Sequence, residues 1–305
     1  AAYAASCGDV HGELLEHVGT DDAAFDMEAI RRSLGQPFAY VGFSYGTFIG
    51  LRYAELFPEG ATGIVIDGVV DPTHSLTDLL RGQAEAFEVV LAEALGDASA
   101  TYDEIAAAVE RAPLPTDDGR GLTPADLATG TFYAGYDPSL WDDLQTGLQD
   151  AAEGNGTVLL AMADAYRDLS SYAPYQAVSC VDFEHPVGGE AWAEFADELE
   201  AISPRFGASI ANEMLPCAFW PAPPDPVNGP VRAEGAPPIL VIGGTGDPAT
   251  PLAQAERVAA DLADGRLLVY DGEGHTAYRR SSCIDDIVER YLIDGELPPD
   301  GTRCS

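Results

Sequence analysis

Residues 42–47 read Gly42-Phe43-Ser44-Tyr45-Gly46-Thr47, a G-x-S-x-G pattern. The serine follows a short apolar run, residues 38–43, which is typical of a buried strand. After Ser44 the apolar residues have helical spacing up to Leu56, and Pro58-Glu59-Gly60 ends the predicted helix. A second buried-strand pattern occupies residues 63–68. Strand, helix and strand at this spacing predict a parallel β-α-β unit.

The position of Ser44 between a predicted strand and a predicted helix favours a catalytic role. A sharp turn lifts the hydroxyl clear of the sheet, and the flanking glycines allow close backbone approach. The helix N-terminus directs N–H groups and positive potential at developing negative charge. We therefore expect Ser44 to be a nucleophile and the Tyr45 backbone N–H to be an oxyanion donor. The alternative is a tight turn that happens to hold a serine.

A serine nucleophile needs a base, and the chain has five histidines, namely His11, His17, His74, His185 and His275. His275 comes just after the last predicted strand, residues 266–270. The carboxyl ends of parallel strands line the crevice in which such folds bind ligands. The other four histidines precede the serine or lie in a helical segment. His275 is therefore the predicted base.

The base needs a carboxylate to orient it. Asp247 follows the predicted strand 238–243, at the same end of the sheet as His275. The chain order Ser, Asp, His is the order of the α/β-hydrolases. Asp67 and Asp71 follow the second strand and are the alternatives to Asp247.

The remaining pattern divides the chain into two parts. Residues 71–236 carry long segments of helical period and few strand signals, and end in a proline-rich stretch, residues 221–226. Strand patterns return at 238–243 and 266–270. We predict an α/β core from residues 1–70 and 237–305. The segment 71–236 is predicted to be a large helical cap inserted after the second core strand.

Charge excludes several classes of function. The chain has 51 acidic and 15 basic residues, all of the latter Arg, and a net charge of −36. Such a surface repels nucleic acids and anionic membranes. The absence of Lys excludes a Schiff base or a phosphate-loop Lys. No apolar run reaches the length of a membrane span.

Five cysteines are widely spaced, at positions 7, 180, 217, 283 and 304. None forms a C-x-x-C pair, which argues against zinc. Wide spacing in an acidic chain suggests disulfides and an oxidising compartment. The odd number leaves one cysteine over.

Four segments together resemble one family: residues 42–47, the strand with Asp67-Gly68 and Asp71-Pro72, residues 244–251, and Gly272-Glu273-Gly274-His275. They look like the secreted actinobacterial tripeptidyl aminopeptidases, α/β-hydrolases related to prolyl peptidases and carboxylesterases. The resemblance is weak through residues 75–175. It implies Ser44 as nucleophile, Asp247 as acid and His275 as base. It also implies a cap over the active site and export from the cell.

The resemblance supports two disulfides, Cys180–Cys217 within the cap and Cys283–Cys304 around the last predicted helix. It leaves Cys7 unpaired. In the family a cysteine far upstream pairs at the position of Cys7, near a Gly-rich segment that supplies the second oxyanion donor.

The implied activity is an exopeptidase that releases short peptides from a free N-terminus, with no metal or organic cofactor. The ammonium group of such a substrate requires carboxylates near the pocket. Asp182 and Glu184 are the candidates. A carboxylesterase or lipase with an apolar acyl pocket is the alternative. A catalytically inactive hydrolase fold used for binding is a third interpretation.

The strand count suggests a further partner. Four core strands are visible, against about eight in an α/β-hydrolase, whose nucleophile strand lies mid-sheet. The nucleophile strand here comes first and would be left as an open edge. We expect an upstream segment of roughly 100 or more residues, either a separate chain or absent from this sequence, with a disulfide to Cys7.

Overall fold

The computed structural model describes residues 1–170, 172–227 and 229–305. Its centre is a sheet of five parallel strands in the order β1-β2-β3-β4-β5. The strands are β1 (Phe38–Phe43), β2 (Ala61–Asp67), β3 (Ile239–Gly246), β4 (Gly265–Glu273) and β5 (Thr302–Cys304). The sequence predicts the first four. It misses β5, whose three residues are too few to show a pattern.

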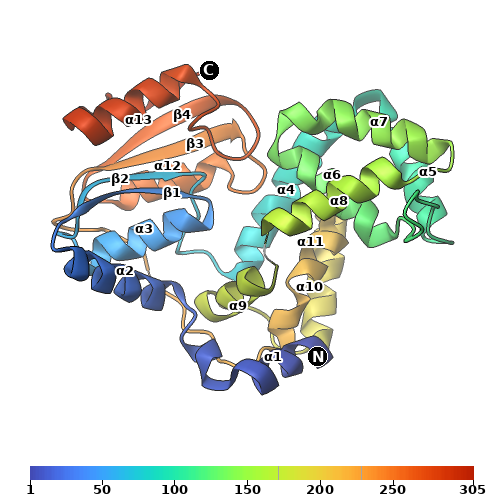
Figure 1. The fold of residues 1–305 in the computed structure, drawn as a ribbon, viewed down its shortest axis with the longest axis horizontal. Helices are drawn as coiled ribbons and strands as arrows, with labels where there is room; N and C mark the ends of the chain where they lie inside the picture. Colours follow the sequence, from blue (N-terminus) through green and yellow to red (C-terminus); the bar gives the residue numbers. More distant parts are fainter. Residues whose placement is uncertain (171, 228) are drawn as a thin grey trace.

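Helices cover both faces of the sheet (Figure 1). On one face, α3 (Tyr45–Leu56) and α12 (Leu252–Asp261) bury Leu51 and Val258 against β2 and β3. On the other, α13 (Ser282–Asp294) buries Ile284 and Val288. Helix α2 (Thr20–Leu34) packs outside α3. Because both faces are covered, the central strands are continuous apolar runs, such as Ile64-Val65-Ile66.

Between β2 and β3 the described residues form helices. They are α4 (Leu76–Leu95), η2 (Gly96–Ala98), α5 (Ser99–Val109), α6 (Pro124–Tyr136), η3 (Pro138–Leu140), α7 (Trp141–Ala152), α8 (Thr157–Ser170), α9 (Tyr172–Asp182), α10 (Gly189–Ile202), α11 (Gly207–Glu213) and η4 (Leu215–Phe219). They enclose their own core, which includes Phe87, Phe132, Trp192 and Phe206. We call these helices the cap.

Local sequence signals begin and end the cap helices. Ser75 and Asp78 form a capping box at the start of α4, and Thr123 and Asp126 do the same for α6. The helical pattern predicted over residues 140–170 is divided into α7 and α8. The division falls at Gly154-Asn155-Gly156, where Gly154 has a φ of 96°.

The first residues of the chain lie with the cap and not with the sheet. Helix α1 (Ala2–His11) and η1 (Gly12–Glu16) contact η4 and α9 (Figure 1). A small apolar cluster of Leu15, Val181 and Ala222 holds them there. The predicted core of residues 1–70 therefore includes an N-terminal part that packs on the cap.

Two disulfides are present, each within the chain. Cys180–Cys217 joins α9 to η4, and Cys283–Cys304 joins α13 to β5. Cys7 is unpaired and partly buried. None of the helices within the described residues is long and apolar enough to cross a membrane.

Candidate active site

Ser44 occupies the turn between β1 and α3 in a strained conformation. Its φ of 52° and ψ of −124° lie in a region that side-chain-bearing residues rarely adopt. A Cβ at Gly42 would lie 2.3 Å from the carbonyl oxygen of Gly46, so only glycine allows this turn. Thr47 Oγ1 donates to the Ser44 carbonyl at 2.6 Å. This is the geometry of the nucleophile elbow.

Asp247 and His275 lie together past the ends of β3 and β4. His275 Nδ1 is 2.9 Å from Asp247 Oδ2 and 3.0 Å from Oδ1. Thr250 donates its backbone N–H and its hydroxyl to the same carboxylate, each at 2.9 Å. The carboxylate is thereby held in the orientation that presents it to the imidazole.

Burial and charge act in opposite directions on this pair. Burial by itself lowers the pKa of His275, but the charge of Asp247, its hydrogen bond and the charge of Asp67 outweigh it and raise the pKa. Burial likewise raises the pKa of Asp247, and His275 with the Thr250 hydrogen bonds brings it below its usual value. The arrangement thus stabilises a carboxylate beside an imidazolium.

The other ring nitrogen of His275 is available. Nε2 is buried and has no hydrogen-bond partner among the described residues. The Ser44 hydroxyl therefore forms no hydrogen bond to His275 Nε2 in this structure, although the triad pattern predicts one. Hydrogen bonds between catalytic groups are often long in unliganded enzymes and tighten only with substrate.

The two alternative acids are engaged elsewhere. Asp67 accepts the backbone N–H groups of Ala277 and Tyr278. Asp71 accepts from Thr73 and pairs with Arg257, whose Nε lies 3.2 Å from Oδ2. Asp247 is therefore the acid that the geometry pairs with His275.

The backbone N–H that the sequence predicts as an oxyanion donor, that of Tyr45, directly follows Ser44. Tyr45 is the first residue of α3, so its N–H has no carbonyl partner within the helix. Its side chain points away to core helix α2, where its hydroxyl lies 2.8 Å from Thr20 Oγ1. This contact fixes the orientation of the Tyr45 side chain.

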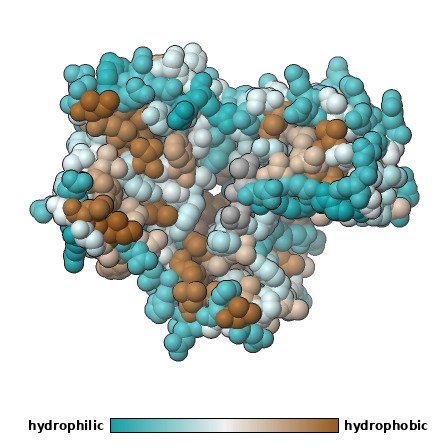
Figure 2. Space-filling model, in the orientation of Figure 1, coloured by the Kyte–Doolittle hydropathy of each residue, from teal (hydrophilic) through white to brown (hydrophobic). Residues whose placement is uncertain are grey.

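Ser44 opens into a cavity of about 560 Å³ between the sheet and the cap. Its wall is mostly apolar, with Val70, Leu80, Phe132 and Phe183 among the lining residues. Figure 2 shows a hollow between the two halves of the molecule on this face. The space suits a ligand of a few residues or an acyl chain.

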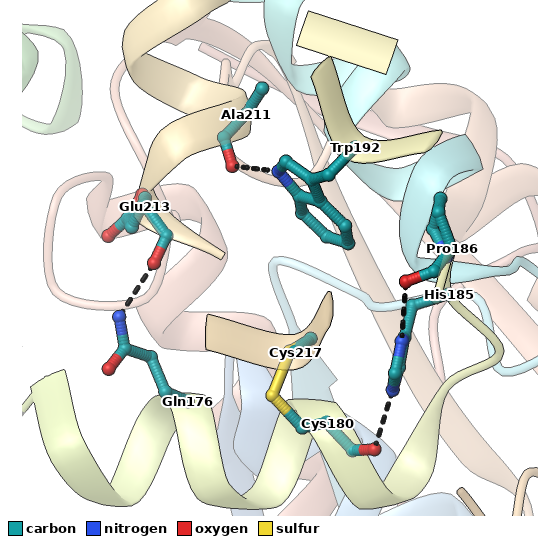
Figure 3. The surroundings of a disulfide bond; sticks show 8 residues. All are labelled: Gln176, Cys180, His185, Pro186, Trp192, Ala211, Glu213 and Cys217. Atoms are coloured by element: carbon teal, nitrogen blue, oxygen red, sulfur yellow. Dashed lines mark hydrogen bonds between the residues drawn. A yellow bond between two sulfur atoms is a disulfide. The ribbon is translucent and has the colours of Figure 1, made fainter. Parts of the chain in front are cut away.

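The cavity wall also contains a carboxyl group that the sequence analysis missed, Glu213 at the end of α11. Burial raises its pKa to about 7, and a hydrogen bond from Tyr172 partly offsets this effect. Tyrosines from three cap helices surround the site, namely Tyr133, Tyr136, Tyr166, Tyr172 and Tyr175. Gln176 holds the Glu213 carbonyl at 2.6 Å (Figure 3).

The two carboxylates predicted to bind an amine lie elsewhere. Asp182 accepts the backbone N–H of Thr20 at 2.8 Å and its hydroxyl at 2.5 Å. It thus caps the first turn of α2. Glu184 is exposed. Neither residue lines the cavity that contains Ser44.

Known proteins give an independent view. Residues 203–304 match the family model described as TAP-like protein. Serine protease Hip1 of Mycobacterium tuberculosis is 34% identical over 340 residues, covering 99% of this chain and 65% of the relative. Carboxylesterase B of the same organism is 31% identical, covering 99% and 64%. Tripeptidyl aminopeptidase of Streptomyces lividans is 28% identical, covering 99% and 61%.

The chain therefore spans less than two thirds of the length of these relatives. The resemblance predicted from the sequence is confirmed: residues 203–304 match the TAP-like family model, and 99% of the chain aligns with a tripeptidyl aminopeptidase.

Proposed function

We propose that this chain carries the catalytic centre of a serine hydrolase. Ser44 Oγ attacks the substrate carbonyl carbon while His275 Nε2 takes its proton, and Asp247 stabilises the imidazolium. The Tyr45 N–H binds the oxyanion. His275 then protonates the leaving group, and a water that it deprotonates hydrolyses the acyl-enzyme and frees Ser44.

The observation that carries this proposal is the strained turn at Ser44, which opens on the cavity, together with the Asp247–His275 pair past the ends of β3 and β4. Labelling with a fluorophosphonate probe tests it, because the probe reacts with an activated serine. Wild-type protein should be labelled and Ser44→Ala should not, with turnover lowered roughly 10⁴–10⁶-fold. A Ser44→Ala protein that keeps its turnover contradicts the proposal.

We infer that the substrate is a peptide with a free N-terminus. Glu213 is the one carboxyl group among the described residues that line the cavity, whose wall is mostly apolar and aromatic. A substrate ammonium would pair with it and repay its desolvation. The tyrosine rings nearby suit a cation as well.

Ester hydrolysis is the second candidate, and the apolar wall of the cavity favours it. An acyl chain needs no amine partner and would leave Glu213 protonated in the apolar site. Turnover of a tripeptidyl anilide against that of a short nitrophenyl ester distinguishes the two. The peptidase proposal requires that acetylation of the anilide's N-terminus abolish most of its turnover.

We also propose that further strands of the same protein pair with β1, and that the protein is exported. The outer edge of β1 is unpaired among the described residues. Nearby, α2 exposes Phe25, Ile30 and Leu34, and Figure 2 shows apolar patches on this half of the molecule. Two disulfides are consistent with an oxidising compartment.

The intact mass of the full-length protein, with and without reductant, tests this link. A disulfide from Cys7 to a cysteine outside these residues is expected. A free Cys7 thiol in the exported protein contradicts that part of the proposal.

A further inference from the structure

Asp67 contacts both sides of the candidate catalytic centre and has no role in the proton transfer described above. It ends β2 and is fully buried. Its backbone carbonyl accepts the N–H of Ser44 at 3.0 Å. Its side-chain Oδ2 accepts the N–H groups of Ala277 and Tyr278, at 2.9 and 2.8 Å. One residue thus holds the turn of the nucleophile and the loop of the base.

The loop that carries His275 needs such support. Thr276 is a β-branched residue at a φ of 67°, and Gly274 on the other side of His275 has a φ of 96°. Strained conformations of this kind persist only where the surroundings over-determine them. The loop therefore relaxes when its contacts are removed.

The backbone N–H groups of this loop are held one after another. His275 donates to the Tyr136 carbonyl at 2.9 Å, and Thr276 donates to Asp247 Oδ2 at 3.3 Å. The next two, of Ala277 and Tyr278, go to Asp67. Asp67 is the one of these acceptors that also bonds the backbone of Ser44.

We propose that Asp67 is a positioning residue that fixes the separation between Ser44 and His275. This inference rests on the proposed hydrolase function and adds a second carboxylate to it. Asp67 acts through the loop backbone, whereas Asp247 acts on the imidazole itself. A misplacement of about 1 Å between reacting groups can lower a rate roughly 100-fold.

The charge of Asp67 adds a measurable consequence. Burial raises the pKa of Asp67 to about 6, and the two backbone N–H groups and His275 oppose that rise. The ionisable groups that act on Asp67 are His275 and Asp247, and Arg280 acts on His275 in addition. The ionised Asp67 raises the pKa of His275. Removing this charge makes the imidazolium less stable.

Two substitutions separate position from charge. In Asp67→Asn the amide oxygen can take the place of Oδ2 and accept both N–H groups, but the charge and the second contact of the Ala277 N–H, to Oδ1 at 3.1 Å, are lost. In Asp67→Ala both the hydrogen bonds and the charge are lost. Glu28→Gln is the matched control, because Glu28 is another buried carboxylate, bound by Arg31 and Tyr53 on α2 and α3.

The experiment measures kcat and KM of the full-length protein on a nitrophenyl ester from about pH 5 to pH 9. We expect Asp67→Ala to lower kcat roughly 10- to 100-fold, with KM within about twofold. Asp67→Asn should lower kcat by less than Asp67→Ala does. The acid limb of its kcat/KM profile should move to lower pH by up to about one unit. Glu28→Gln should lose thermal stability and keep the wild-type profile.

The outcomes are distinct. Wild-type kcat in Asp67→Ala, or an unmoved acid limb in Asp67→Asn, overturns the proposal. If Asp67→Ala does not fold, the pH profile of the isosteric Asp67→Asn decides alone. Failure of the hydrolase function itself would appear earlier, as wild-type protein with no more turnover than Ser44→Ala.

Discussion

The imidazole of His275 packs against the backbone of Gly68, where a Cβ would lie 2.9 Å from His275 Cε1. The same Cβ would lie 2.9 Å from Thr276 Cγ2, and Gly68 has a φ of 69°. The residue after β2 thus leaves room for the base of the candidate triad. Glycine is required here for both space and backbone conformation.

Gly68→Ala should therefore displace His275 and lower kcat, on the order of 100-fold if the ring moves by about 1 Å. The left-handed conformation adds a loss of about 1–2 kcal/mol in the free energy of unfolding. Urea unfolding and ester turnover measure the two effects separately. Gly82→Ala is the control, because a Cβ there meets no atom within 4 Å. Equal activity in both variants would contradict the prediction.

Asp247→Asn tests the acid. An amide in place of the carboxylate removes the charge that stabilises the imidazolium and favours the wrong tautomer of His275, which should cost about 10⁴-fold in kcat. The pKa of His275 is raised partly by Asp247, so the residual activity should have its acid limb at lower pH. Rates of the variant measured between about pH 5 and pH 9 check both points. Activity within tenfold of wild type would move the acid role to another residue.

The signals for Ser44, Asp247 and His275 are local ones. Each residue follows a strand in the sequence, and parallel strands bring their carboxyl ends to one edge. The spacing therefore predicts their neighbourhood without any knowledge of side-chain packing. The same logic correctly predicts β1 to β4 and misses β5, which pairs with β4 beside the Cys283–Cys304 disulfide.

Glu213 could not be predicted in this way. It ends a helix of seven residues, and its neighbours in the cavity come from α6, α8 and α9. Their assembly depends on the packing of the cap and not on a repeat or a motif. Asp182 shows the converse: the sequence does not reveal that its carboxylate accepts two hydrogen bonds from Thr20 at the start of α2.

Glu213→Gln tests the proposed amine site. Loss of the charge should raise KM for a tripeptidyl anilide with a free N-terminus on the order of 100-fold, as for a buried charge pair. An ester without an amine should be unaffected. Glu194→Gln, at an exposed carboxylate of α10, is the control. Equal effects on anilide and ester would argue for a structural role of Glu213.

The pH dependence of the wild-type protein gives a second test of Glu213. Its pKa is raised to about 7, and an ammonium ion binds the carboxylate form. As the pH falls below about 7, Glu213 becomes protonated, so KM for the free anilide should rise. KM for the ester should stay flat over the same range. Parallel KM curves for the two substrates would exclude Glu213 as the amine partner.

The two disulfides, one in the cap and one beside the sheet, can be compared to test how the cap affects catalysis. Cys180–Cys217 and Cys283–Cys304 close loops with sequence separations of 37 and 21 residues. Replacing both cysteines of a pair by Ser should cost about 4 and about 3 kcal/mol of unfolding free energy in the chain-entropy model. The energies are similar, so any difference in catalysis reflects where each bond lies.

Only the first bond supports the cavity wall. It joins α9, which carries Tyr175 and Gln176, to η4, and Gln176 holds the carbonyl of Glu213 (Figure 3). Its removal should loosen the wall and raise KM for the anilide more than it lowers kcat. Removal of Cys283–Cys304, which pins β5 at the far edge of the sheet, should leave both constants near wild type at a temperature where the protein stays folded. Steady-state kinetics and thermal melts of the two double variants check these expectations. If both double variants change KM by the same factor, the Cys180–Cys217 disulfide does not shape the cavity.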